Sequence, residues 1–245
     1  METKSPFRVL GLGVHTDDLD YSIGGTAMLL ADAGCEVKFI TMTSEQHVVS
    51  GEALHEPLPL PGVTRELYRP EDGFYTHDSE KATLGLEKKI REFAPDILFL
   101  MWPRDNHMEH AAAAKIQINA AFRAGRIREA YAYEVGPLQT MSQFGMPDIT
   151  VDISSKLDEL QPILASYFTT KLGADCFMEE KEVSARFRGY SAYANFRYGE
   201  SLRVVKLPEG HDDFLLRQLL GDKFRWGGVG AYWIGRRYYD FGGNV

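Results

Sequence analysis

The chain has 245 residues, of which 44% are hydrophobic and 25% are charged, a composition typical of a globular protein with a large core. Its formal net charge of −8 disfavours a general affinity for nucleic acid or anionic membranes, because both attract clustered Lys and Arg. Two cysteines, Cys35 and Cys176, are too few for a disulfide framework, and we expect both to be reduced thiols in the core. No apolar stretch reaches the ~18 residues of a membrane span, and the first residues do not resemble a secretion signal, so we expect a cytoplasmic protein.

The first part of the chain predicts a strand–helix–strand unit. Residues 7–14 (FRVLGLGV) form a continuous apolar run, which is typical of a strand buried on both faces of a parallel sheet. Residues 22–33 have apolar side chains at helical spacing, and Gly34 is expected to end that helix. Residues 37–42 (VKFITM) predict a second strand. A unit of this kind usually begins a doubly wound parallel sheet.

Strands and helices continue to alternate after an irregular segment. Residues 44–76 are rich in proline, glycine and charge, which predicts a long loop that covers a pocket. Beyond it we expect helices from residue 79 to a stop at Pro95 and over 111–124, 154–168 and 179–198, and strands over 96–102, 131–135, 149–153 and 202–207.

This order predicts an α/β fold with a Rossmann-like, mostly parallel sheet, helices on both faces and functional residues at the carboxyl ends of the strands. We expect a single domain over residues 1–245, with a core at about 7–207 and a C-terminal extension at 208–245. The extension concentrates aromatic residues among glycines. Core packing, a lid over the site and a contact within a homo-oligomer are the alternatives for it.

Two polar segments begin where a predicted strand gives way to a helix. Residues 15–18 (HTDD) follow the first strand, and residues 107–110 (HMEH) follow a later one. Because the carboxyl ends of parallel strands border one crevice, we expect the two segments to meet. His15, Asp18 and His110 would supply three nitrogen or oxygen ligands, and a fourth position left to water is typical of catalytic zinc. The imidazole-rich set favours Zn²⁺ over other divalent metals such as Fe²⁺.

This ligand set leaves Asp17 and His107 free for chemistry. A zinc ion lowers the pKa of water from 15.7 towards ~7, and an adjacent carboxylate can take the proton. A histidine on the opposite side can stabilise an oxyanion or protonate a leaving nitrogen. Asp20, Asp105 and Glu109 are expected near the ligands, where a carboxylate either orients a ligand histidine or ends a loop.

The two segments resemble the signatures of a known family. Residues 14–26 (VHTDDLDYSIGGT) resemble the Ala-His-Pro-Asp-Asp-x-Glu…Gly-Gly-Thr signature of the PIG-L/LmbE family of zinc-dependent N-acetylglucosaminyl deacetylases. Residues 103–110 (PRDNHMEH) resemble the second motif of that family, Asp-x-His-x-Asp-His. The motifs come in the family order, and the resemblance covers about residues 7–207.

Several positions depart from the family pattern. Thr16 replaces proline, Asp20 replaces glutamate and Glu109 replaces aspartate, but none of these is a predicted ligand. Family members usually carry a helix with an Arg-x-x-Glu pattern where this chain has residues 44–76, and residues 65–66 are only a remnant of it. The substrate-binding residues therefore stay unassigned.

The resemblance implies zinc on His15, Asp18 and His110, Asp17 as general base, and His107 as the group that stabilises or protonates the intermediate. It implies hydrolysis of an N-acetyl group on an amino sugar or small N-acetylglucosaminide. Two alternatives are a hydratase of an unsaturated carboxylic acid on the same metal site and a zinc protein without catalytic activity. A nucleotide site is rejected, because the carboxylates of residues 17–18 would repel a diphosphate.

Overall fold

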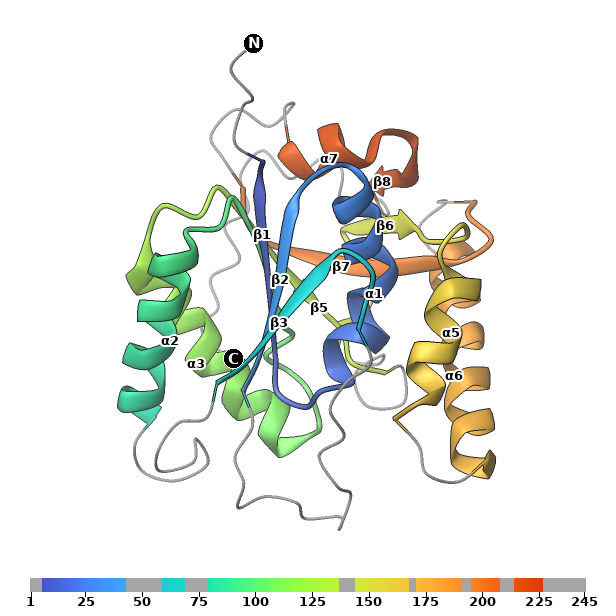
Figure 1. Cartoon of the computed structure of the whole chain (residues 1–245), viewed down its shortest axis with the longest axis horizontal. Coiled ribbons are helices and arrows are strands. Elements are labelled where there is room, and N and C mark those ends of the chain that lie inside the picture. Colours follow the sequence, from blue (N-terminus) through green and yellow to red (C-terminus); the bar gives the residue numbers. More distant parts are fainter. Residues whose placement is uncertain are drawn as a thin grey trace.

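The computed structural model has one eight-stranded sheet at its centre, with helices on both faces (Figure 1). The structure describes residues 6–42, 59–68, 79–136, 144–167, 171–190, 195–207 and 214–226.

The sheet has the strand order β3-β2-β1-β4-β5-β7-β6-β8. Its first five strands are parallel, and their order of 3-2-1-4-5 agrees with that of a doubly wound sheet. In sheet order these five are β3 (Val63–Tyr68), β2 (Glu36–Met42), β1 (Arg8–Gly13), β4 (Ile97–Met101) and β5 (Glu129–Tyr133).

The other three strands are antiparallel to their neighbours, so the sheet is mixed and the prediction of a mostly parallel sheet was wrong. Strand direction depends on how the chain returns to the sheet, and the hydrophobic pattern of a strand does not record it. These strands are β7 (Gly199–Lys206), β6 (Ile149–Asp152) and β8 (Phe224–Trp226).

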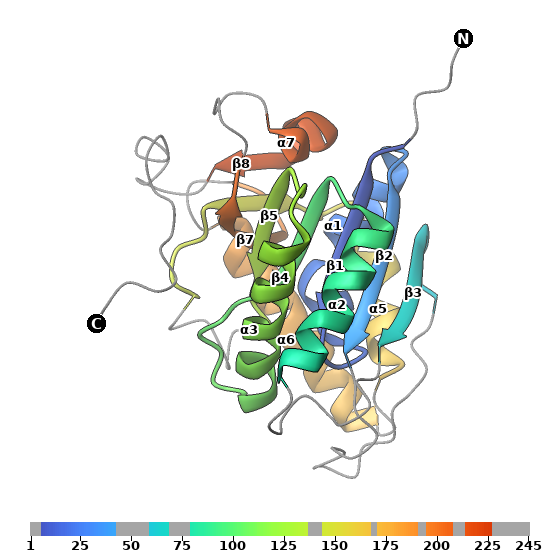
Figure 2. The same cartoon turned by 90° about the vertical axis from the view of Figure 1, so that its left-hand side faces the viewer.

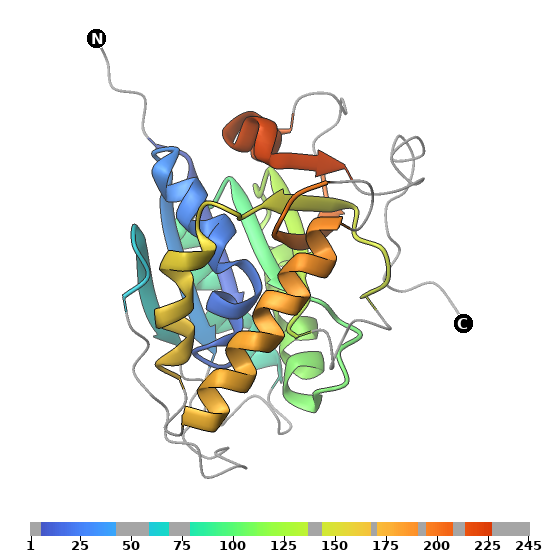
Figure 3. The same cartoon turned by 90° about the vertical axis from the view of Figure 1, so that its right-hand side faces the viewer.

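The helices cover both faces of the sheet, as predicted. Figure 2 shows the face covered by α2 (Ser79–Phe93) and α3 (Met108–Ala124). Figure 3 shows the opposite face, where α5 (Leu157–Ala165) and α6 (Lys171–Tyr190) lie outside α1 (Asp18–Asp32). A short helix α7 (Leu215–Leu220) and the 3₁₀ turn Gly221–Lys223 lead into β8.

Close packing of β1 explains its glycines. A Cβ atom on Gly11 would come within 2.7 Å of the Phe39 ring, and one on Gly13 within 2.9 Å of the Leu19 side chain. Both glycines therefore allow neighbouring side chains to pack directly on the strand that carries His15 at its end.

Two helices begin earlier than predicted. Helix α1 begins at Asp18 rather than at residue 22, and α3 begins at Met108 rather than at residue 111. The second histidine segment therefore begins at the N-cap, His107, and continues into the first turn of α3. Helix α6 spans Lys171–Tyr190, so it both begins and ends eight residues earlier than predicted.

The predicted loop over residues 44–76 contains a strand, because β3 at Val63–Tyr68 forms the edge of the sheet beside β2. The rest of that segment, except residues 59–62, lies outside the described residues. The aromatic extension also lies outside them from residue 227 on. Its first part belongs to the sheet, since Trp226 ends β8 and its ring lies 4.9 Å from that of Phe214.

Both cysteines are free, but only one is in the core. Cys35 is buried, as predicted, whereas Cys176 is exposed on α6, so its assignment to the core was wrong. Within the described ranges, no helix is both long and apolar enough to cross a membrane.

Candidate metal centre

The two ligand segments meet at one end of the sheet. Strands β1 and β4 are parallel neighbours, with Val9 opposite Ile97. His15 lies two residues beyond the end of β1, and His110 lies in the first turn of the helix that follows β4. Adjacent parallel strands thus bring together residues 95 positions apart in the chain.

Three candidate ligand atoms face one another at the centre of the site. The Nδ1 atom of His15 lies 3.6 Å from Oδ1 of Asp18 and 3.2 Å from Nε2 of His110. The same Nε2 atom of His110 lies 3.3 Å from Oδ1 of Asp18. Ligands at ~2.0–2.1 Å from a tetrahedral zinc ion are separated by roughly 3.3 Å. The three atoms therefore fit a divalent cation without rearrangement.

The second oxygen of Asp18 is held by the backbone. Its Oδ2 atom accepts hydrogen bonds from the N–H groups of Val14, at 3.0 Å, and His15, at 2.7 Å. Because these bonds fix the carboxylate, Oδ1 is directed at the two histidines.

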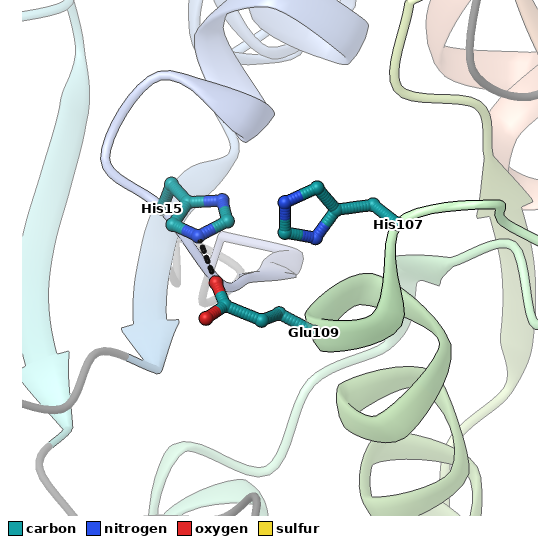
Figure 4. A group of neighbouring side chains, drawn as sticks. All are labelled: His15, His107 and Glu109. Carbon is teal, nitrogen blue, oxygen red and sulfur yellow. Dashed lines mark hydrogen bonds and ion pairs between the residues drawn. The ribbon is translucent and has the colours of Figure 1, made fainter. Parts of the chain in front are cut away.

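Each of these two histidines also has a carboxylate at its outer nitrogen. His110 Nδ1 lies 2.9 Å from Oδ2 of Asp105, and His15 Nε2 lies 2.6 Å from Oε2 of Glu109 (Figure 4). A carboxylate acceptor on the outer nitrogen sets the tautomer and ring orientation of a metal-binding histidine. Asp105 also accepts the backbone N–H of His107 at 2.8 Å, which ties this loop to the start of α3.

The charges of His15, Asp18 and His110 stabilise one another. Burial opposes protonation of both histidines, but the neighbouring Asp18 carboxylate outweighs it and raises the pKa of His15 to about 9 and that of His110 to about 10. Burial likewise disfavours ionised Asp18, but the two histidines outweigh that effect and hold its pKa well below the usual range. A cation that binds here would displace the histidine protons.

Asp17 lies beside the ligands, at the N-terminus of α1. Burial and then the charge of Asp18 raise the pKa of Asp17 to about 6. Its side chain makes no capping hydrogen bond to the helix, so the carboxylate is not committed to the structural role of an N-cap.

His107 lies across the site from His15, with 5.3 Å between the ring centroids (Figure 4). Burial and then the neighbouring His110 and His15 lower its pKa, so that the ring is neutral at pH 7. Its buried Nδ1 atom finds no hydrogen-bond partner among the described residues. A buried polar atom without a partner is the expected state of a group that meets a ligand.

Asp20 has other partners than the ligand histidines. The Nη2 atom of Arg65 donates to both of its carboxylate oxygens, at 2.8 and 2.9 Å, and the Tyr167 hydroxyl donates to it as well. The same hydroxyl lies 3.1 Å from the carbonyl oxygen of Thr16. Asp20 therefore connects α1 to the edge strand and to the end of α5. The sequence drew attention to Arg65 only as a remnant of a family pattern, and nothing in it singled out Tyr167.

A second buried carboxylate supports α1 from the opposite side. The backbone of α1 is not helical at Ile23, with φ −135° and ψ 16°. Glu200 accepts the N–H groups that follow, from Gly25 at 3.1 Å and Thr26 at 2.7 Å, as well as the Thr26 hydroxyl at 2.7 Å. Lys181 neutralises this carboxylate at 3.0 Å. The Gly-Gly-Thr part of the first motif thus has a structural partner.

Comparison with known proteins gives a likeness of fold. No family model matches the sequence. A conserved protein from Thermus thermophilus has a TM-score of 0.60 at 19% identity, with 80% of this chain and 93% of that chain covered. The 4-carboxy-2-hydroxymuconate hydratase of Pseudomonas putida has a TM-score of 0.59 at 16% identity, with 85% and 99% covered. The N,N′-diacetylchitobiose deacetylase of Pyrococcus horikoshii has a TM-score of 0.59 at 17% identity, with 85% and 89% covered. The chain therefore shares its fold with a deacetylase, as the resemblance of its motifs to the PIG-L/LmbE family implied.

Proposed function

We propose that this protein is a metal-dependent N-deacetylase of the PIG-L/LmbE family, acting on an amino sugar or a small N-acetylglucosaminide. One observation carries the proposal. The ligand atoms of His15, Asp18 and His110 face one another at the separations a tetrahedral cation needs, while the other polar atom of each side chain is already bound. A cluster that only stabilised the fold would not need its inner atoms to converge.

A divalent ion fits this donor set, and Zn²⁺ is the ion that two imidazoles and one carboxylate favour, with Fe²⁺ as the alternative. Such an ion supplies a lowered pKa for water and polarisation of a carbonyl group. His15, Asp18 and His110 would hold it. Asp105 and Glu109 would keep the two imidazoles in the required orientation.

Asp17 and His107 are proposed to carry the proton transfer and charge stabilisation. The water oxygen joins the acyl carbon, the amide C–N bond breaks, and acetate and a free amine leave. Asp17 takes a proton from the attacking water, which its buried and uncapped carboxylate suits. His107, neutral and without a partner at Nδ1, supplies an N–H hydrogen bond to the oxyanion. The proton that Asp17 takes from water passes to the leaving nitrogen, unless His107 first accepts it and delivers it there.

Hydration of an unsaturated carboxylic acid is the second candidate, because a hydratase has the same fold. A substrate with carboxylates requires unpaired cationic groups near the metal. Arg65 lies at the edge of the site, but its Nη2 atom binds the Asp20 carboxylate, which offsets its charge. This pairing favours the deacetylase, whose substrate is a neutral amide.

The test is acetate release by purified protein that has been stripped of metal and reconstituted with Zn²⁺ or Fe²⁺. The substrates are a panel of N-acetylated amino sugars and glycosides, and hydration of unsaturated dicarboxylic acids is measured in parallel. A chelator-treated sample and the Asp17→Asn variant are the controls. Acetate release that both controls abolish supports the proposal. Hydration without acetate release, or no reaction from fully metal-loaded protein, contradicts it.

A further inference from the structure

Helix α6 carries an apolar stripe on its exposed side. Val183, Phe187 and Tyr190 have 61%, 51% and 65% of their surface exposed, and exposed Cys176 lies seven residues before Val183. Spacings of seven, four and three residues put all four side chains on one side of a helix. Single exposed apolar residues are ordinary, but three large ones within eight residues on one side of a helix form a patch that is typical of an interaction surface. We call these four residues the α6 stripe.

The opposite side of α6 packs against the rest of the molecule. Lys181 binds Glu200, and Arg188 donates to Glu134 through Nε and Nη2, at 2.5 and 2.6 Å. These buried ion pairs fix the helix against the sheet. Figure 3 shows α6 on the outer surface of this face, so the α6 stripe points away from the core.

We propose that the α6 stripe is the contact between two copies of this chain, which pair across a two-fold axis near Val183 with their α6 helices antiparallel. The charges beside the α6 stripe favour a second copy of this chain as its partner. The N-terminal half of the helix is acidic there, with exposed Asp175 and Glu179, whereas exposed Arg186 lies in the C-terminal half. A surface that is acidic at one end and basic at the other is complementary to a second, antiparallel copy of itself related by a two-fold axis.

The pairing can be followed residue by residue. Glu179 and Arg186 are seven residues apart and so lie on the same flank of the α6 stripe. Glu179 is four residues before Val183 and Arg186 is three after it, so an antiparallel copy brings the two side chains level. The symmetry makes this ion pair twice. Parallel helices would instead set Glu179 against Glu180 of the other copy, which is a repulsive contact.

Arg186 is able to make the second bond. Its Nη2 atom lies 3.5 Å from Glu182 on the same helix, and its side chain is still 54% exposed. Glu182 and Tyr198 engage part of the guanidinium group, which has five N–H donors, so others are left for a carboxylate of the other copy.

The contact is short. The α6 stripe spans 15 residues from Cys176 to Tyr190, or about 21 Å at 1.5 Å per residue step. A single helix contact of this length buries less area than the roughly 800 Å² per partner of a stable interface. We therefore expect a weak dimer whose population rises with protein concentration.

The first experiment is crosslinking by mild oxidation. In an antiparallel pair the two copies of residue 183 face each other, so Val183→Cys in a Cys176→Ser background should give a covalent dimer. The wild-type protein is the control, because the same geometry separates its two Cys176 residues by about 21 Å, beyond the ~7 Å limit for a disulfide. Rapid crosslinking of the wild type, or none in the variant, contradicts the antiparallel pair.

The second experiment is sedimentation velocity over a range of concentrations. Phe187→Glu should weaken association at least ~10-fold, whereas Phe122→Glu should not. Phe122 is an 88% exposed aromatic residue on α3, on the opposite face, and is therefore a matched control. Glu179→Arg and Arg186→Glu should each weaken the dimer, and the double variant should restore it. A wild type that stays monomeric at all concentrations overturns the proposal. A dimer that forms only after removal of residues 227–245 also overturns it, since that segment would then be the occupant of the stripe.

Discussion

The Nε2 atom of His15 lies 2.6 Å from Oε2 of Glu109 (Figure 4), just as Nδ1 of His110 has a carboxylate partner in Asp105. Glu109 comes from the first turn of α3, one residue before His110. The start of α3 therefore supplies both one predicted ligand and the group that orients the other. This arrangement leaves the Nδ1 atom of His15 directed at Asp18 and His110.

Glu109→Gln should weaken metal binding by roughly 10–100-fold, the usual cost of losing an outer partner of a ligand histidine. The amide removes the charge that holds the His15 tautomer, while the three ligands stay in place. Competition with a chromophoric chelator measures the affinity directly and independently of activity. Glu92→Gln, at an exposed carboxylate on α2, is the matched control. Equal affinities of the two variants would show that Glu109 does not position His15.

Asp17→Asn should reduce kcat by about 10²–10⁴-fold, the usual contribution of a general base, because the amide cannot take a proton from water. Asp17 is not among the atoms that converge on the metal position, so the metal affinity should change little. The variant therefore separates catalysis from binding, provided that metal content is measured on the same sample. Full activity at normal metal content would remove Asp17 from the mechanism.

The pH dependence of kcat/KM should show an acid limb at or below pH 6. Burial and then Asp18 raise the pKa of Asp17 to about 6, and a bound cation would lower it from there. The base works only when it is deprotonated, so activity should fall as the pH drops through that pKa. Rates measured at saturating metal between about pH 4.5 and 8 check this, with metal occupancy followed at each pH. An activity that rose on acidification would require a different base.

The sequence predicted which side chains meet at this site better than it predicted the contacts around them. Strand ends and the two histidine segments were enough to bring His15, Asp18 and His110 together. The partners of Asp20 were not predictable, because Arg65 comes from a strand inside a segment that reads as loop, and Tyr167 from the end of a distant helix. Contacts of this kind depend on tertiary packing and leave no local pattern.

In the fold, too, features with a local sequence pattern were predicted, whereas features set by tertiary packing were not. Buried strands such as β1 and β4 were predicted within two residues, since a continuous apolar run is characteristic of a strand covered on both faces. Edge strand β3 was missed because none of its residues is fully buried and the adjacent Arg65 and Glu66 interrupt its apolar pattern. The antiparallel direction of β7 was missed because strand pairing is not encoded in the strand itself.

The two cysteines should differ sharply in reactivity. Burial and then the nearby Asp96 charge raise the pKa of the Cys35 thiol to about 11, so at pH 8 it is protonated as well as buried. Because the thiolate is the reactive form, only exposed Cys176 should react with a disulfide reagent in dilute native protein. Two thiols should react after denaturation, and Cys176→Ser should show almost none before it. Rapid native labelling of Cys35 would mean that β2 and its surroundings open readily.

Glu200→Ala should be among the most destabilising substitutions in the chain. The carboxylate is almost fully buried. It accepts hydrogen bonds from the N–H groups of Gly25 and Thr26, which follow the non-helical residue Ile23 in α1. Its loss would also leave the Lys181 ammonium buried and unpaired. Breaking a buried ion pair from one side costs about 3–5 kcal/mol, which urea denaturation monitored by circular dichroism can measure.

Two further variants test whether the loss of stability comes from breaking the buried Lys181–Glu200 pair. Glu159→Ala removes a half-exposed carboxylate that pairs with Lys156, and it should change the free energy of unfolding by less than ~0.5 kcal/mol. Combining Lys181→Met with Glu200→Gln removes both charges while keeping an acceptor for the backbone of α1. That double variant should be more stable than the sum of its single changes predicts, because neither charge is left buried alone. Strict additivity would mean that Lys181 and Glu200 do not act as a pair.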